Sequence, residues 1–168
     1  MAARERFELL LTPSVYQTAW RYACYLTARR EDAEDVLQEA LTHAYLRFHQ
    51  LRNLENFRGW LLSIIRTKFI ASYRKARRTP APVDLPNTLA DDHGEPLLEA
   101  LQQVLKRLSA SQQEVLVLYY LEGLNITEAA LVVGCKPNAL KQRLWRARGA
   151  LERLLEPHFA QSDMVALL

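Results

Sequence analysis

The 168-residue sequence predicts an all-α protein of two small helical domains joined by a Pro-rich acidic linker, with a helix-turn-helix in the C-terminal domain. Apolar residues recur with helical spacing on both sides of residues 79–96. Within 79–96, four prolines and four acids without one base interrupt that spacing. Residues 125–148 have the pattern of two helices joined by a tight turn. We therefore expect an N-terminal domain at 1–78, a C-terminal domain at 97–157 and a tail at 158–168.

The N-terminal domain is expected to contain four helical segments. Two of them share residues 4–28 and are separated at Pro13, because a proline inside a helix clashes with the preceding turn. The next helix covers 30–50 and begins with acids, which suit the positive end of the helix dipole. A polar loop at 49–57 leads into a helix over 57–78.

The C-terminal domain is expected to contain four helices, of which the first two cover 97–108 and 112–121. Two overlapping pairs have capping-box spacing before the second of them, Ser109 with Gln112 and Ser111 with Glu114.

The last two helices form the expected helix-turn-helix. Asn125 and Glu128 have the spacing that satisfies the first free N–H groups of a helix. Gly134 follows the apolar run 129–133, where a helix end requires a positive φ. Pro137 suits the first turn of the next helix. This geometry places a second helix in the major groove of DNA.

That second helix has a basic outer face, since residues 136–153 contain six bases and one acid. A merely solvated helix is the alternative, but such a face usually interleaves acids with bases. DNA binding is therefore favoured. The candidate residues are Lys136, Asn138, Lys141, Gln142, Arg143, Trp145, Arg146 and Arg148.

The overall net charge of +3 is unevenly distributed along the chain. Residues 1–78 carry a net charge of +6, residues 79–96 carry −4, and residues 97–168 carry +1. Two basic segments on either side of an acidic segment suggest that the protein contacts a polyanion at two places. The second half of the helix at 57–78 has six basic residues and no acid. Together with Trp60, this composition suits binding to a phosphate backbone and to exposed nucleotide bases. Trp60 taken alone is more typical of a core residue.

Several classes of protein are disfavoured by the composition. Cys24 and Cys135 lie in different expected domains, so neither a disulfide framework nor a CxxC metal site is available, and a reducing cytosol is the simplest location. No run approaches the roughly 20 apolar residues of a membrane span, which indicates a soluble cytoplasmic protein. The histidines are scattered and no Gly-rich phosphate loop occurs, so we expect no enzyme, cofactor or metal.

The segment DAEDVLQE at 32–39 precedes Trp60-Leu61 and a basic helix. The Pro-rich linker, EGLNITEAALVVGC and LKQRLWRARGAL follow in that order. Over about residues 5–155, the chain resembles the extracytoplasmic-function (ECF) sigma factors of bacterial RNA polymerase. The resemblance implies a non-enzymatic initiation factor whose two domains recognise the promoter −10 and −35 elements. Its implied partners are core RNA polymerase, promoter DNA and, as in most relatives, an anti-sigma factor.

The resemblance also implies roles for individual residues. Asp35, Gln38 and Glu39 correspond to the surface that binds core polymerase. The residues assigned to the −10 element are Asn53, Asn56, Trp60, Arg66, Lys68, Arg74, Lys75 and Arg77. Thr67 and Ala71 depart from the Asn and Asp that many members carry, and Ala71 offers no polar contact.

In the C-terminal domain, Lys141, Gln142, Trp145 and Arg146 match positions that face the −35 bases, although Trp145 packing against the fold is an equal alternative. Two rival functions remain: a stand-alone helix-turn-helix regulator that acts without polymerase, and a helical adaptor that binds only proteins.

Overall fold

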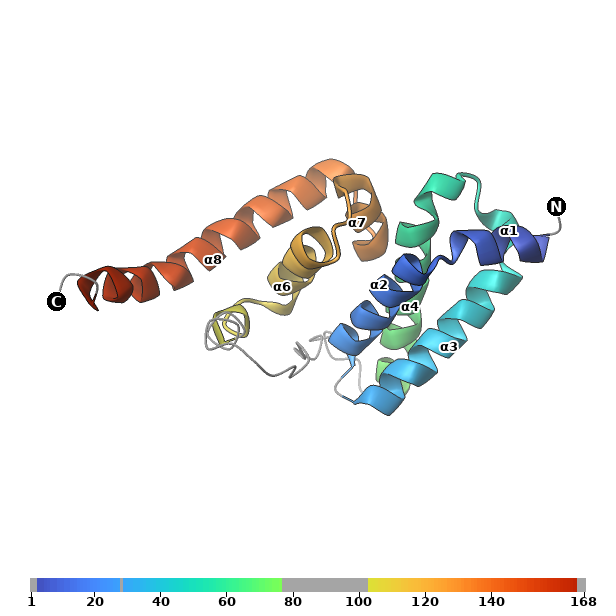
Figure 1. Ribbon diagram of the computed structural model, residues 1–168, viewed down its shortest axis with the longest axis horizontal. Coiled ribbons are helices and arrows are strands. Elements are labelled where there is room, and N and C mark those ends of the chain that lie inside the picture. Colours follow the sequence, from blue (N-terminus) through green and yellow to red (C-terminus); the bar gives the residue numbers. More distant parts are fainter. Residues whose placement is uncertain (1–2, 28, 77–102, 166–168) are drawn as a thin grey trace.

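The computed structural model describes residues 3–27, 29–76 and 103–165, with side chains up to residue 157. The described residues form helices and no strand, which confirms the all-α class. Figure 1 shows two groups of helices lying against each other, with the last helix reaching away from the body. The expected linker at 79–96 and the first half of the expected helix at 97–108 lie outside the described residues.

Four α-helices and two short 3-10 turns make up the N-terminal group (Figure 1). They are α1 (Ala3–Leu10), α2 (Pro13–Leu26), α3 (Arg30–Leu46), η1 (Phe48–Gln50), η2 (Leu54–Asn56) and α4 (Phe57–Ala76). The expected break at Pro13 is confirmed, because Thr12 caps α2 by accepting the Val15 N–H at 3.3 Å. Helix α3 ends at Leu46, earlier than expected, and Phe48 then turns inward to pack its ring 5.4 Å from that of Phe7.

The C-terminal group contains α6 (Ala110–Leu116), the π turn η3 (Val117–Leu121), α7 (Ile126–Val133) and α8 (Pro137–Val165). The capping box before α6 is the pair Ser109 and Gln112. The helix expected at 112–121 begins earlier, at Ala110, and it changes from α to the wider π geometry after Leu116. There the Glu122 N–H donates to the Val117 carbonyl at 2.9 Å.

Helix α8 extends beyond Pro157 to Val165, into the segment that we expected to be a tail at 158–168. A proline inside a helix removes one backbone hydrogen bond and crowds the preceding turn. Pro157 is exposed, so water can solvate the carbonyl that loses its partner.

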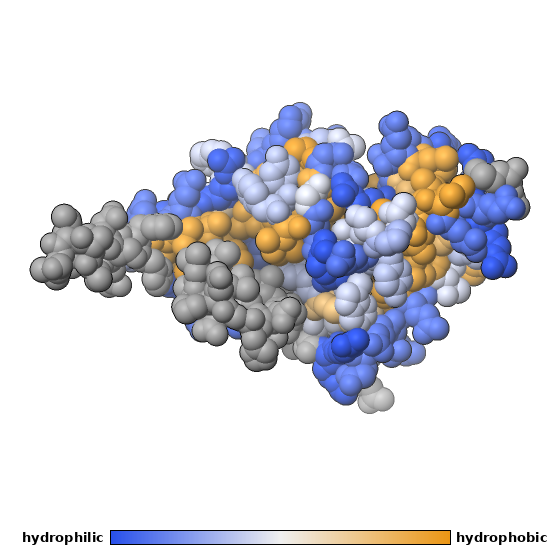
Figure 2. Space-filling model, in the orientation of Figure 1, coloured by the Kyte–Doolittle hydropathy of each residue, from blue (hydrophilic) through white to orange (hydrophobic). Residues whose placement is uncertain are grey.

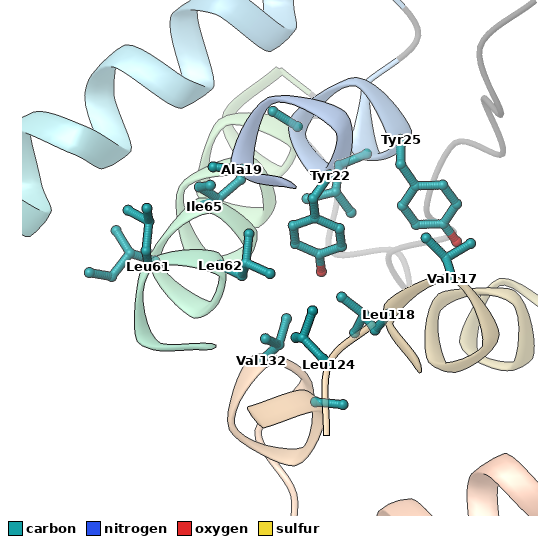
Figure 3. Close-up of a cluster of buried hydrophobic side chains, with 14 of the residues drawn as sticks. Ala19, Tyr22, Tyr25, Leu61, Leu62, Ile65, Val117, Leu118, Leu124 and Val132 are labelled. Atoms are coloured by element: carbon teal, nitrogen blue, oxygen red, sulfur yellow. The ribbon is translucent and has the colours of Figure 1, made fainter. Parts of the chain in front are cut away.

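One hydrophobic core is shared by the two groups of helices. Figure 3 shows Tyr22 and Tyr25 of α2 and Leu62 of α4 lying toward side chains of the C-terminal group, while Ile65 of α4 lies near Ala19 of α2. The labelled C-terminal residues are Val117, Leu118, Leu124 and Val132. Apolar residues also reach the surface along α8 and near α1, between larger hydrophilic areas (Figure 2). The shared core fixes how the basic surfaces of the two groups are oriented.

Candidate nucleic-acid and polymerase interfaces

The helix-turn-helix is built by local hydrogen bonds at both ends of α7. Asn125 Oδ1 accepts the Glu128 N–H and Glu128 Oε2 accepts the Asn125 N–H, each at 2.9 Å. Gly134 then adopts φ +72°, and the Cys135 N–H donates to the Ala130 carbonyl at 3.0 Å. The predicted cap, turn and start of α8 are confirmed. These bonds set the angle at which α8 leaves α7.

Helix α8 divides into a buried side and a basic side. Leu140, Leu144 and Ala147 are buried against the C-terminal group. All eight residues predicted to bind DNA on this helix and just before it are exposed. None of the basic ones forms an ion pair with a carboxylate in the part of the chain whose side chains are described. Their positive charge is therefore available to a polyanion.

Trp145 lies on the outside of α8 with 75% of its surface exposed, so it does not pack against the fold. With 3.6 residues per turn, Asn138, Gln142 and Trp145 share the face opposite the buried stripe. Arg143 and Arg148 flank the stripe on its two sides. This arrangement gives α8 a central face for bases and two edges for phosphates.

A hollow of about 490 Å³ lies beside this face, between α8 and the start of α6. Its lining residues are Gln112, Trp145, Arg146, Arg148, Gly149, Glu152 and Arg153. The guanidinium groups of Arg148 and Arg153 at this hollow suit a phosphate, although the hollow also contains the carboxylate of Glu152.

A second candidate interface lies on α3. Asp35, Gln38 and Glu39 are exposed and line one shallow groove of about 430 Å³. The groove also contains Thr42, His43, Leu46 and Lys68. Leu46 is 66% exposed, so the polar groove has an apolar end. Thr42 and His43 lie four residues after Gln38 and Glu39 on the same helix. This spacing places them on the same face as the predicted residues, so the sequence alone could have identified them.

His43 has an unusual environment in this groove. Its Nδ1 is buried without a hydrogen-bond partner among the described residues. Desolvation, with the nearby charges of Arg47 and Lys68, lowers the pKa of its imidazole. His43 therefore favours the neutral form in this groove.

The residues predicted to bind the −10 element are not gathered into one surface. Arg74 and Lys75 are exposed in the last turn of α4, whereas Lys68 pairs with Glu39 at 2.7 Å in the α3 groove. Trp60 is half-buried and packs near Phe57, with ring centroids 6.2 Å apart. Arg77 lies outside the described residues.

The loop before α4 holds the two predicted asparagines. Asn53 is exposed, and its Oδ1 accepts the Glu55 N–H at 3.0 Å to cap η2. Asn56 is half-buried at the end of η2. On α4, Thr67 Oγ1 donates to the Ser63 carbonyl at 2.8 Å, and Ala71 is exposed.

Arg66, another predicted −10 residue, faces the C-terminal group. Its Nε and Nη2 donate to the two carboxylate oxygens of Glu114 at 2.8 and 3.2 Å. Burial works to lower the Arg66 pKa, but hydrogen bonding and the charge of Glu114 raise it. Sequence reasoning missed this role, because nothing local links residues so far apart along the chain.

The described residues contain no group of three or more His, Cys, Asp or Glu side chains that could hold a metal ion. Among them, no helix is both long and apolar enough to cross a membrane.

Comparison with known proteins matches both halves of the chain to one protein family. Residues 11–79 match the family description "Sigma-70 region 2", and residues 98–151 match "Sigma-70, region 4". The chain is 31% identical over 139 residues to the ECF RNA polymerase sigma factor EcfG of Rhodopseudomonas palustris, covering 80% of this chain and 77% of the relative. It is 30% identical over 142 residues to the ECF RNA polymerase sigma factor SigM of Bacillus subtilis, covering 80% and 86%.

Two solved structures share the fold. One is the sigma factor RpoE in complex with the anti-sigma factor NepR from Bartonella quintana, with a TM-score of 0.69, 28% identity and coverage of 92% of this chain and 98% of that one. The other is CnrH in complex with the cytosolic domain of CnrY, with a TM-score of 0.62, 25% identity and coverage of 90% and 88%. The two matched regions, the ECF relatives and the exposed basic helix-turn-helix agree, and the chain belongs to the ECF family of RNA polymerase sigma factors.

Proposed function

We propose that this sigma factor binds core RNA polymerase through the α3 groove and directs it to promoters through the outer face of α8 and the end of α4. The observation that carries the proposal is the exposed basic face of α8, set by the capped helix-turn-helix. The stretch 136–148, which carries five bases and no acid on this exposed side, suits the major groove of DNA.

The outer face of α8 contains residue types suited to distinct contacts. Lys141 and Arg146 are suited to guanine O6 and N7, and Gln142 to adenine N6 and N7. Trp145 is placed for apolar contact with a base edge, because its ring is exposed at the centre of this face. Arg143, Arg148 and Lys136 are placed for phosphates, which position a protein without specifying sequence.

The α3 groove suits a polymerase surface that is basic with an apolar component. Asp35 and Glu39 supply negative charge, Gln38 supplies an amide, and the exposed Leu46 supplies an apolar end. Lys68 neutralises part of the charge of Glu39 by pairing with it. Asp35 is therefore the acid of this groove with the most charge left for a partner.

In the N-terminal domain, we assign −10 recognition to the loop at 49–57 and to Trp60, Arg66, Lys68, Arg74, Lys75 and Arg77. Asn53 and Asn56 have amide groups that can pair with the edge of an unstacked base. The basic end of α4 supplies charge for the DNA backbone.

Regulation by a protein inhibitor is part of this proposal. The two structural relatives were solved with bound partners, an anti-sigma factor for RpoE and the cytosolic domain of CnrY for CnrH. An anti-sigma factor is therefore a proposed partner of this chain. We place the protein in the cytoplasm, where bacterial polymerase acts, and assign it no catalytic activity.

A gel-shift experiment separates this function from that of a stand-alone regulator. Promoter duplex is titrated with the purified protein, with core polymerase, and with both. We expect a specific shifted complex only with both, because each domain alone offers a small contact area and the polymerase joins the two. Specific nanomolar binding by the free protein would favour the stand-alone regulator instead.

A further inference from the structure

Helix α8 contains a glycine that neither a turn nor packing explains. Gly149 lies inside the helix, where glycine is less stable than alanine because its backbone loses more freedom on folding. Its φ is not positive, unlike that of Gly134. Among the described residues, the side-chain atom that an added Cβ would meet is Arg153 Nη1, at an ordinary contact distance of 3.8 Å. The fold of the described chain therefore leaves room for a larger residue here.

Gly149 forms part of the wall of the hollow of about 490 Å³ between α8 and the start of α6, which we call the α8 hollow. Arg148 and Arg153 also line it. With 3.6 residues per turn, these two arginines project about 140° apart around the helix, with Gly149 between them. Arg153 reaches back along α8, since its Nη1 is the atom that an added Cβ would approach. The two guanidinium groups thus flank the position on α8 that has no side chain.

The α8 hollow is positively charged, because three arginines and one acid, Glu152, line it. Arg148, Arg153 and Glu152 form no ion pair among the side chains that the structure describes. A guanidinium presents paired N–H donors that match two oxygens of a phosphate. Both arginines can therefore donate to an anion that approaches from solvent.

Gln112 adds a donor from α6. Its Oε1 already accepts the Ser109 N–H and the Ser109 hydroxyl, each at 3.1 Å, as part of the cap of that helix. These bonds orient the amide and leave its N–H groups as the atoms that can bind a ligand. Gln112 therefore favours the same class of ligand as the arginines, a group rich in acceptor oxygens.

We propose that the α8 hollow binds one phosphate of the DNA backbone beside the −35 element, held between Arg148 and Arg153. Gly149 leaves room for the strand to lie against α8, since glycine allows a backbone to approach a ligand closely. The inference rests on the proposed function of α8, to which it adds Gln112, Gly149 and Arg153 as positioning residues.

The position of the hollow favours a DNA strand over a free phosphate compound. Trp145 and Arg146 line the hollow and also belong to the face of α8 assigned to the −35 bases. A helix that reads bases in the major groove must pass a sugar-phosphate strand where it leaves the groove. The hollow continues the base-reading face toward the C-terminal end of α8, where this crossing occurs.

A scan of the DNA backbone tests the phosphate site. Promoter duplexes that each carry one neutral methylphosphonate, placed in turn along both strands around the −35 element, are bound to core polymerase with full-length protein. We expect one position at which the methylphosphonate weakens binding of the unmodified protein by about tenfold, because a charged hydrogen-bond acceptor is lost. The same methylphosphonate should have little further effect on Arg153→Ala, which already lacks the donor.

Arg6→Ala is the control for this scan, because it removes an exposed arginine from the other domain. It should respond to every methylphosphonate as the unmodified protein does. If no phosphate loses its effect in Arg153→Ala, or if Arg6→Ala loses the same effect, the phosphate site is overturned.

Glu152 predicts a change in the opposite direction. Its carboxylate repels a phosphate in the hollow, so Glu152→Gln should tighten binding to all promoter sequences by about two- to fivefold. Unchanged or weaker binding by Glu152→Gln would contradict a phosphate beside this carboxylate.

Substitutions at Gly149 separate binding from folding. Gly149→Ala and Gly149→Leu should weaken promoter binding progressively, and Gly149→Leu should lose about as much affinity as Arg153→Ala. Thermal unfolding should show no loss of stability in either variant, because alanine and leucine both favour a helix more than glycine does. Promoter binding by Gly149→Leu as tight as that of the unmodified protein would overturn the role of the glycine.

Arg146→Ala in the same assay distinguishes failure of this inference from failure of the proposed function. If Arg146→Ala relaxes the −35 preference while the Arg153 and Gly149 variants bind normally, the phosphate site is wrong and base reading by α8 stands. If none of the three positions affects promoter binding, both the phosphate site and the role of α8 are wrong.

Discussion

At the scale of single residues, Glu128 forms both a helix cap and an ion pair to a distant helix. It completes the capping box of α7 by accepting the Asn125 N–H, and it accepts two hydrogen bonds from Arg58, 70 residues away in the sequence. The cap is visible in the sequence because its partners are three residues apart. The ion pair is not, because sequence spacing carries no information on contacts between distant helices.

Trp145 and Leu144 are neighbours on α8 with opposite environments, and they give a matched pair of substitutions. Leu144 is 7% exposed, so Leu144→Ala should lower the free energy of unfolding by about 2–5 kcal/mol. Trp145→Ala should change it by less than about 0.5 kcal/mol, because the ring makes little contact with the fold. Trp145→Ala should nevertheless weaken promoter binding by the polymerase complex.

Chemical denaturation and a gel shift on the same two variants check this prediction. A large loss of stability in Trp145→Ala would show that the ring packs against the protein.

Arg146 and Arg143 separate base recognition from phosphate binding on the same helix. Arg146→Ala should relax preference at one −35 base pair by about 1–3 kcal/mol, because a bidentate contact to guanine is lost. Arg143→Ala should weaken binding to all sequences alike and reduce the salt slope by about 1, because one phosphate contact is lost. Competition among single-base variants of the −35 element, repeated at several salt concentrations, measures both effects. Loss of base preference in Arg143→Ala alone would reverse the two assignments.

Tyr22 makes the free energy of unfolding depend on pH in the alkaline range. Burial raises the pKa of its hydroxyl well above the ordinary value of 10.0. The negative charge of Glu114 and the hydrogen bond to that carboxylate raise the pKa further. An unfolded chain therefore loses this proton at lower pH than the folded protein does. The stabilising contribution is fully present below about pH 10 and is lost as the pH rises above it.

Tyr22→Phe removes the titrating group and should make the free energy of unfolding fall less steeply above pH 10 than in the unmodified protein. Urea denaturation at a series of pH values measures this slope. Identical slopes in the two proteins would contradict the assignment.

At the scale of elements, the helix-turn-helix was the most predictable part of the fold. Its cap at Asn125, its turn at Gly134 and the start of α8 at Pro137 each depend on residues within a few positions. The change to π geometry after Leu116 was not predictable, because Val117–Leu121 is an apolar run that also suits an α-helix.

Gly134 and Gly149 test the turn against an ordinary helical position. Gly134 has φ +72°, so Gly134→Ala should cost about 1–2 kcal/mol of stability. Gly149 lies inside α8, and a Cβ there would approach only the Arg153 guanidinium at 3.8 Å. Gly149→Ala should therefore stabilise the protein by about 0.5–1 kcal/mol. Thermal unfolding of both variants provides the comparison, and a stabilising Gly134→Ala would contradict the left-handed turn.

Helix α3 offers a matched pair for polymerase binding. Asp35→Lys places a positive charge in the α3 groove and should weaken binding to core polymerase with little change in stability. Glu31→Lys makes the same change of charge at another exposed position of this helix, outside the groove, and should bind nearly as well as the unmodified protein. Equilibrium binding to labelled core polymerase measures both. Equal weakening by the two substitutions would indicate a general charge effect in place of a defined site.

At the scale of the whole molecule, three ion pairs join the N-terminal and C-terminal groups of helices. They are Arg66–Glu114, Arg58–Glu128 and Arg21–Glu122, whose partners lie 48, 70 and 101 residues apart in the sequence. The sequence predicted two basic bodies and a helix-turn-helix, since charge distribution and capping can be read locally. It predicted Arg66 as a DNA contact, whereas in this structure Arg66 holds Glu114 across the shared core. The structure therefore shows that Arg66, which the family resemblance assigned to DNA, is paired with Glu114 of the C-terminal group.

The central claim is that the two domains select promoters together, as a sigma factor on core polymerase. In vitro transcription tests it most directly, with core polymerase, a genomic template and mapped start sites, in the presence and absence of this protein. We predict a new set of start sites that share two upstream motifs at a constant spacing, and that this set disappears with the Asp35→Lys variant. Unchanged start sites, with polymerase that does not retain the protein, would contradict the claim.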